Sequence, residues 1–174
     1  MKSDIITIDN QGNGFESAHK EAEKVSQYRE LTHKEALKLL LCTEELLSLA
    51  RSVTGELKAT FWVESEGRSF DLHLSTRTVM DREKRKNLIA SATSRKNDAA
   101  NSFLGKLRDK FEEAMTSDAD YSIPPEALAD LANHPIENPD WDGYESSVLR
   151  KVSDQVRISI RGGTVDMVVS KSFD

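Results

Sequence analysis

The chain has 174 residues, a formal net charge of −6 and 37% hydrophobic residues, which suits one globular domain with one core. Its longest uninterrupted apolar stretch, 39–42, is far below the roughly 20 residues that a membrane-spanning helix needs. The N-terminus lacks the apolar region of a secretory signal. A single cysteine, Cys42, excludes an intramolecular disulfide and a multi-cysteine metal site. We expect a cytoplasmic protein that forms a single domain over 1–174.

Charge is unevenly distributed along the second half of the chain. Residues 82–110 contain nine Lys and Arg against three acids, whereas 111–145 contain ten acids and no Lys or Arg. Neighbouring blocks of opposite sign indicate two surfaces that face each other or two surfaces that face partners. The net negative charge argues against a dedicated nucleic-acid binder.

The N-terminal third predicts one strand and two helices. The β-branched run at 5–8 ends in a turn and predicts a strand. Apolar residues recur at intervals of three and four over 15–29, which indicates an amphipathic helix. Thr32 and Glu35 form a capping box that opens a leucine-rich helix of about 22 residues, which stops at Gly55. We expect this long helix to be central to the core.

Two hairpins are predicted by alternation of apolar and polar residues. The first covers 57–63 and 70–74, on either side of a tight turn. The second covers 156–169 and is interrupted by Gly162 and Gly163. Glycines supply the positive φ angles that a two-residue hairpin loop requires.

Helical and loop segments separate the two hairpins. The pattern over 81–117 is helical and divides into two pieces near 91–97. All four prolines lie in the acidic stretch that follows, which predicts a loop or flexible insertion around one short helix. A further short helix is predicted at 148–152, directly before the second hairpin.

The element order is therefore β-α-α-β-β-α-α-loop-α-β-β. Paired strands with long helices between them predict an α+β fold, a two-layer sandwich with a mixed, mostly antiparallel sheet and helices on one face. The long charge-segregated segment at about 77–143 is expected to be an insertion in this single domain.

Common catalytic and metal-binding patterns are absent from the sequence. No pair of histidines has metal-ligand spacing, and there is no phosphate-binding glycine loop or nucleophile elbow. Cys42 follows three leucines, which favours a small apolar filler over a nucleophile. The basic run Arg82–Lys86 could contact phosphates, but a solvated helix face opposite the acidic block is the favoured interpretation.

One family resemblance rests on segments at both ends of the chain. Segment 41–51, LCTEELLSLAR, resembles the second helix of the Bergerat-fold (GHKL) ATPases, within them the anti-sigma-factor serine kinase branch. Segment 148–163, VLRKVSDQVRISIRGG, is similar to the closing helix and hairpin of that branch. With the hairpin at 57–74, the likeness covers about two-thirds of the chain. The resemblance implies the fold of histidine-kinase-like ATPases, with ATP and magnesium as cofactors and an ATP lid in the region of the insertion.

The catalytic positions of the family are altered here. In the family an acid activates water or a hydroxyl, and an asparagine one helical turn later helps to hold magnesium. The resemblance places Glu44 or Glu45 at the acid. The residue four positions later is then Ser48 or Leu49, and leucine cannot coordinate a metal.

The nucleotide-binding positions are altered too. The aspartate that reads adenine in the family corresponds to Thr76, whose hydroxyl cannot fully replace a carboxylate. The phosphate-binding glycines correspond to Gly143 and Glu145, and a carboxylate at a helix N-terminus repels phosphate there. These losses argue against ATP and magnesium binding.

Three hypotheses follow. The first is a bacterial regulatory protein with a degenerate ATPase fold that acts through a protein partner, by resemblance a sigma factor or an anti-anti-sigma-like protein. The second is an active ATP-dependent serine/threonine kinase, with Glu44 or Glu45 as base and phosphate contacts from Arg82, Lys84 or Arg85. The third and weaker one is a nucleic-acid-contacting module that uses 82–110. Relatives of this branch often dimerise, so a homodimer is a further expectation.

Overall fold

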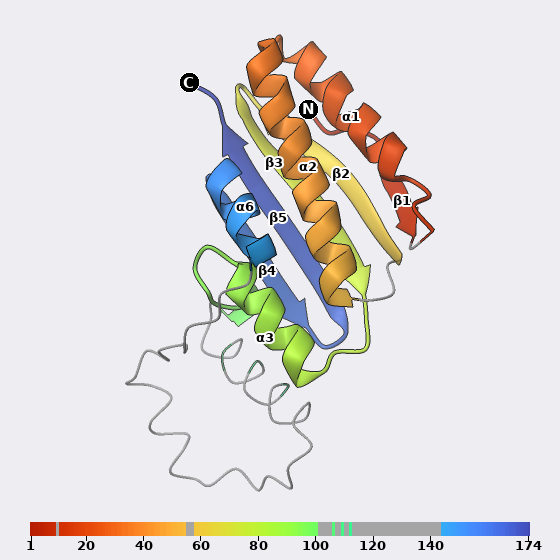
Figure 1. Ribbon diagram of the computed structural model, residues 1–174, viewed down its shortest axis with the longest axis vertical. Helices are drawn as coiled ribbons and strands as arrows, with labels where there is room; N and C mark the ends of the chain where they lie inside the picture. The colour runs from red at the N-terminus through yellow and green to blue at the C-terminus, as the bar shows by residue number, and fades with distance from the viewer. Residues whose placement is uncertain (10, 55–57, 101–105, 107–108, 110–111, 113–143) are drawn as a thin grey trace, which may run out of the picture.

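The computed structural model describes residues 1–9, 11–54, 58–100, 106, 109, 112 and 144–174 (Figure 1). In this part of the chain lie β1 (Ile6–Asp9), α1 (Phe15–Tyr28), α2 (His33–Thr54), β2 (Lys58–Glu66), β3 (Ser69–Arg77), α3 (Arg82–Ser91), the 3-10 helix η1 (Asp98–Ala100), α6 (Tyr144–Val152), β4 (Gln155–Arg161) and β5 (Thr164–Ser172). Each described element has the type that the sequence predicts. The second helical piece predicted before 117 and the acidic loop after it lie mostly or wholly outside the described residues.

The five strands form one open sheet in the order β1-β2-β3-β5-β4. The four α-helices of the described part lie on one face of this sheet (Figure 1). The α+β fold with helices on one face is thereby confirmed. The prediction of a mixed sheet is wrong for the described strands, because every pairing is antiparallel. The reason is that β5, the second strand of the last hairpin, lies next to β3, so the strand direction alternates across the sheet.

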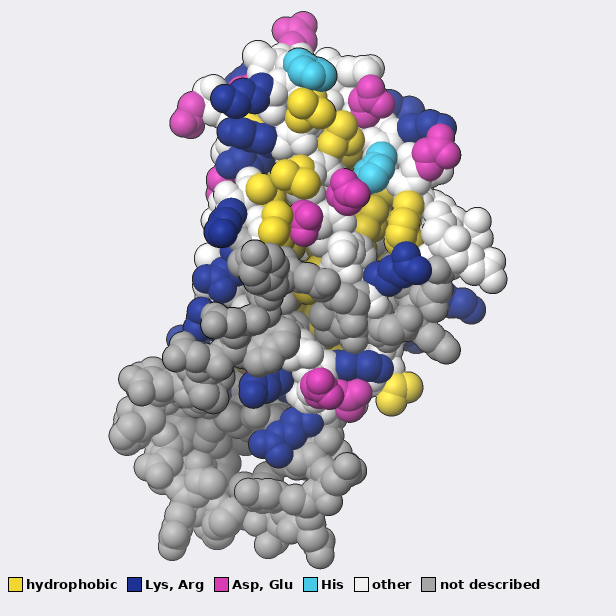
Figure 2. All heavy atoms as spheres, viewed as in Figure 1, with side chains coloured by type: hydrophobic (Ala, Val, Ile, Leu, Met, Phe, Trp, Pro, Cys, Tyr) yellow, Lys and Arg dark blue, Asp and Glu magenta, His cyan; other side chains and the backbone are white. Residues whose placement is uncertain are grey.

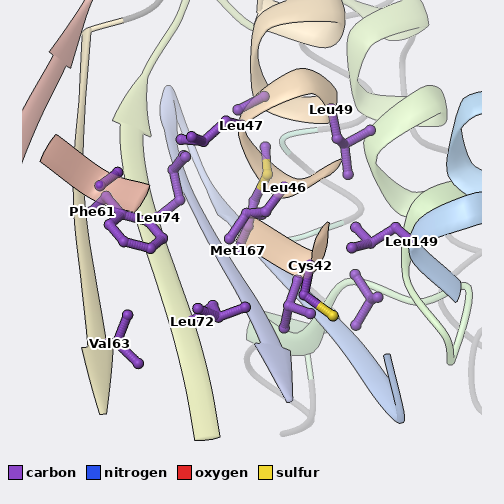
Figure 3. Packing of buried hydrophobic residues seen from close by; sticks show 14 of the residues in the cluster. Cys42, Leu46, Leu47, Leu49, Phe61, Val63, Leu72, Leu74, Leu149 and Met167 are labelled. Atoms are coloured by element: carbon purple, nitrogen blue, oxygen red, sulfur yellow. The ribbon is translucent and has the colours of Figure 1, made fainter. Parts of the chain in front are cut away.

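The core lies between the sheet and the helices. Side chains on each strand alternate between buried and half-buried, as expected for a sheet with one covered face. Phe61, Leu72 and Met167 point from neighbouring strands toward α2 (Figure 3). On the helix side, Leu46 and Leu149 close the same cluster. Every one of these five side chains is almost completely buried, so one continuous core holds both hairpins and the long helix together.

Helix α2 is the central helix, as its leucine content predicts. The capping box is present: Thr32 N–H donates to Glu35 Oε2 at 2.8 Å, and Glu35 N–H donates to Thr32 Oγ1 at 3.4 Å. The helix runs for 22 residues and packs against α1, α3, α6 and the sheet. Its predicted stop at Gly55 lies outside the described residues.

The loop between β4 and β5 differs in detail from its prediction. Of the two glycines in this loop, only Gly162 has a positive φ, of 58°. Gly163 is required for another reason, because a Cβ there would lie 2.8 Å from the carbonyl oxygen of Thr78. Thr78 N–H donates to the Gly163 carbonyl at 2.9 Å, so the chain leaving β3 is held against this turn.

The segment after α3 covers the edge of β4. Asn97 Oδ1 accepts from Ile160 N–H at 2.8 Å, and Asn97 Nδ2 donates to the Ile160 carbonyl at 3.0 Å. Thr93 makes the equivalent pair of bonds with the backbone of Val156. Unpaired backbone groups at a sheet edge invite pairing with other chains, and the Asn97 side chain together with the backbone N–H and the hydroxyl of Thr93 satisfies them here.

Candidate functional site

The two candidate acids point in different directions from α2. Successive residues turn by about 100° around a helix, so residues three, four and seven apart share a side. Glu44 and Ser48 are exposed and lie on the side away from the sheet. Glu45 is half-buried and lies on the side of Cys42 and Leu49, which faces α6. The structure therefore separates Glu44 with Ser48 from Glu45 with Leu49.

Leu49 takes the position that follows Glu45 by one helical turn. Its side chain is 6% exposed and lies toward Leu149 of α6 (Figure 3). An apolar contact of this kind stabilises the junction of α2 with α6 but offers no ligand to a metal ion. A pair of metal-holding side chains is thus missing from the side of α2 where Glu45 lies.

Thr76 lies on the helix-facing side of β3, between Ala59 and Val165 of the neighbouring strands. It is 3% exposed, and its Oγ1 donates to the Lys58 carbonyl at 2.9 Å. The hydroxyl therefore already uses its only proton in a hydrogen bond to the backbone of β2. The side chain acts as a satisfied polar group inside the core.

The candidate phosphate contacts of α3 do not form one group. Arg82 is exposed at the first residue of the helix. Lys84 Nζ donates to the Val79 carbonyl at 3.2 Å, beside the N-terminus of α3. Arg85 is 4% exposed and forms an ion pair with Asp109, although its Nη1 is buried without a hydrogen-bond partner. Burial removes Arg85 from any basic surface that 82–110 could offer to phosphates.

The remaining candidates are only partly described. Gly143 lies outside the described residues. Glu145 belongs to the first turn of α6, where the backbone alone is described. Their predicted role at the phosphates therefore stays a prediction.

Cys42 and the other titratable groups show no catalytic arrangement. Burial is the main cause that raises the pKa of the Cys42 thiol to about 11, which fits the apolar filler expected from sequence. No cluster of three or more His, Cys, Asp or Glu in the described part of the chain is arranged to hold a metal ion. None of the helices described is long and apolar enough to cross a membrane.

An ordered polar surface on the outer face of the sheet is not evident from the sequence. Trp62 and His73, opposite each other on β2 and β3, stack with ring centroids 4.7 Å apart. Lys2 lies over the Trp62 ring at 4.7 Å and pairs with Glu64 at 3.1 Å. The alternation within each strand signals these outward positions, but only the register between strands reveals which of them are neighbours.

The sequence matches no protein-family model, and no curated protein matches it either. The family resemblance therefore rests on the residue pattern and the order of elements alone.

Proposed function

We propose that this chain is a bacterial regulatory protein with a degenerate Bergerat fold of the anti-sigma-kinase type, which acts by binding a protein partner. The order of two helices, hairpin, helix, closing helix and hairpin is compatible with that fold. The position of Leu49 is the main support for the proposed loss of nucleotide binding. It is packed toward Leu149, in the place where the family uses asparagine to hold magnesium.

The outward side of α2 supports the protein-binding part of the proposal. Leu37 is 52% exposed and Leu41 is 37% exposed, one helical turn apart. Figure 2 shows hydrophobic side chains gathered along this helix, with acidic side chains beside them. Exposed apolar side chains that lie together on a helix suit the groove or helix of a partner. By the family resemblance, this partner is a sigma factor or an anti-anti-sigma-like protein.

Isothermal titration with magnesium-ATP tests the nucleotide part. We expect no binding heat from the full chain. Micromolar binding would show that the chain binds nucleotide and would contradict the proposed degeneracy of the site. Leu49→Asn is the informative companion variant, because it restores the amide one turn after Glu45.

Co-purification from the native host tests the partner. The double variant L37S/L41S should lose a protein that the parent chain retains. Lys86→Ser, an exposed change on α3, is the matched control and should retain it. Equal recovery with all three proteins would exclude the outward side of α2 as the binding surface.

The active kinase is the second candidate, and the position of Glu45 favours it. Glu45 lies on the side of α2 that faces α6, where a base beside the nucleotide would be needed. This candidate predicts phosphate transfer from ATP to a partner, lost in Glu45→Gln and retained in Glu44→Gln. Absence of transfer from the parent chain would exclude it.

A further inference from the structure

The outward side of α2 carries a stripe in which basic and apolar residues alternate. Lys34, Leu37, Lys38 and Leu41 occupy positions i, i+3, i+4 and i+7, so they share one side of the helix. All four residues are exposed, and we call them the mixed stripe. Figure 2 shows Lys and Arg side chains along the left margin of the molecule, where β5 ends, beside the apolar side chains of α2. The apolar part of the partner-binding surface therefore has a basic flank.

The acids nearest to the two stripe lysines already have partners. Glu35 pairs with Arg68 at 2.6 Å, and Asp154 pairs with Lys171 at 2.5 Å. Burial opposes ionisation of Asp154, yet hydrogen bonds from Lys171 and the Ser172 backbone, with the charges of Lys171 and Lys38, lower the pKa of its carboxyl. Among the described residues, no acid lies within ion-pair distance of either stripe lysine. Both ammonium groups are therefore available to acids of a partner.

A pocket opens beside these lysines, at the N-terminal end of α2. It has a volume of about 380 Å³, and its lining includes Lys34 and Lys38 from the helix and Lys171 and Phe173 from the C-terminal segment. Asp174 also lines the pocket, but among the described residues it forms no ion pair with these lysines. The pocket thus offers room for a carboxylate of a bound partner next to two unpaired ammonium groups.

We propose that the mixed stripe binds an acidic amphipathic helix of the partner protein; this specification of the partner rests on the proposed function. Two apolar residues one turn apart on that helix pack on Leu37 and Leu41. Acidic residues beside them pair with Lys34 and Lys38, and one of their carboxylates enters the pocket. Recognition of a helix through residues at i, i+3, i+4 and i+7 needs this kind of surface, because those residues lie on one side of the bound helix.

Glu44 limits the length of the acidic part of the partner. It is exposed and lies seven residues after Leu37, on the same side of α2. Because like charges repel, the acids of the partner must be confined to the two turns of the mixed stripe, roughly 10 Å along the helix axis.

The same residue favours a protein helix over an anionic membrane. A flat lipid surface that reached Lys34 and Lys38 would also meet Glu44 on the same side of α2. Only Leu37 and Leu41 would enter the lipid, whereas helices that lie on membranes bury a whole apolar face. A helix with a short acidic stretch avoids the repulsion and matches the two apolar side chains.

Fluorescence anisotropy with a designed peptide and the full chain tests the proposal. The probe is a labelled alanine-rich peptide of about 18 residues, long enough to be partly helical in water, with Glu, Leu, Glu and Leu at i, i+3, i+4 and i+7. The comparison peptide carries Lys in place of both Glu residues. We expect the acidic peptide to bind about tenfold more tightly than the basic one, with a preference that weakens as salt is added.

Charge reversal on α2 is the decisive step. The double variant Lys34→Glu/Lys38→Glu should prefer the basic peptide over the acidic one, because both ion pairs become repulsive with the acidic probe. Lys86→Glu/Lys96→Glu, at exposed positions on and after α3, is the control of equal charge change and should keep the parent preference. Circular dichroism of each variant verifies that a changed preference is not loss of the fold.

Co-purification with the same variants distinguishes failure of this proposal from failure of the proposed function. If L37S/L41S loses the partner but Lys34→Glu/Lys38→Glu retains it, the partner does not bind through acids, and only the acidic-helix proposal is overturned. If the peptides show the expected preference but every variant recovers the same proteins, the charge preference of the stripe is supported and the proposed function is contradicted.

Three further results overturn the proposal. The first is absence of binding by the acidic peptide, or equal binding of both peptides. The second is association of the parent chain, but not of Lys34→Glu/Lys38→Glu, with vesicles of equal parts phosphatidylcholine and phosphatidylglycerol, which would assign the stripe to anionic lipid. The third is a dimer in sedimentation velocity that the same double variant dissociates, which would assign the stripe to a second copy of the chain.

Discussion

The two faces of the sheet use the same five strands for different purposes. On the helix-facing side, the core residues are almost uniformly apolar, for example Phe61, Leu74 and Ile158. On the outer side, polar and charged residues alternate with them and form rows across the strands. Because the side-chain period of a strand is two, one register fixes both faces at once. The inner face specifies the fold, and the residues of the outer face are free to determine what the protein binds.

Truncation of one side chain on each face should give the largest difference in the free energy of unfolding between the two faces. Phe61 is completely buried, and Phe61→Ala should lower the free energy of unfolding by about 3–5 kcal/mol. Thr60, the next residue of β2, faces outward and is half-buried. Thr60→Ala should cost less than about 1 kcal/mol, mainly through lower β-propensity. Urea unfolding of both variants measures the two values, and equal losses would contradict this division of the sheet.

A polar position on the inner face gives the second test. Thr76→Asp introduces the carboxylate that the family carries, but at a site that is 3% exposed and directed toward the Lys58 carbonyl. We expect a loss of about 3 kcal/mol, because a buried charge without a partner is strongly destabilising.

Thr76→Val is the matched control, since it keeps the shape and loses only the hydrogen bond. It should cost about 1 kcal/mol. If Thr76→Asp proved as stable as the parent chain and bound ATP, the interpretation of this site as part of the core would be wrong.

The edge of the sheet gives a third, smaller effect. Asn97 is 4% exposed and bonds both backbone groups of Ile160 on β4. Asn97→Ala should lower stability by about 2 kcal/mol, because buried backbone groups lose their partners. Hydrogen exchange at the Ile160 amide should be faster in Asn97→Ala than in the parent chain. Ser94→Ala, at an exposed position of the same segment, should change stability by less than about 0.5 kcal/mol.

Most of the fold could be predicted because its signals are local. The alternation in both hairpins and the capping box at Thr32 depend on residues a few positions apart. The all-antiparallel sheet could not be predicted, because it depends on β5 lying next to β3, a contact between distant segments. The role of Asn97 has the same origin, since its partner Ile160 lies 63 positions away.

The candidate site was harder to predict for another reason. Leucines surround so much of α2 that its core-facing side is not evident from the sequence, and Glu44 and Glu45 remained equivalent choices. Burial in the structure distinguishes them. The rows of the outer face were also hidden, because a residue such as Arg77 acquires its neighbours only through strand register.

Removal of a single charge on the outer face, that of Glu64, should have the smallest effect on the free energy of unfolding. A hydrogen bond from Trp62 Nε1, at 2.9 Å, is the largest cause that lowers the pKa of Glu64, followed by one from Lys2. A carboxyl with a lower pKa in the folded state stabilises the fold above its unfolded pKa of about 4.3, and this contribution disappears as pH falls through the folded value. Glu64→Gln should therefore cost less than about 1 kcal/mol at neutral pH, because exposed ion pairs contribute little.

The difference between the parent chain and Glu64→Gln should shrink as the pH is lowered below the folded pKa of Glu64. Urea midpoints measured over a range of pH test this expectation. A difference that grows on acidification would contradict the assigned direction.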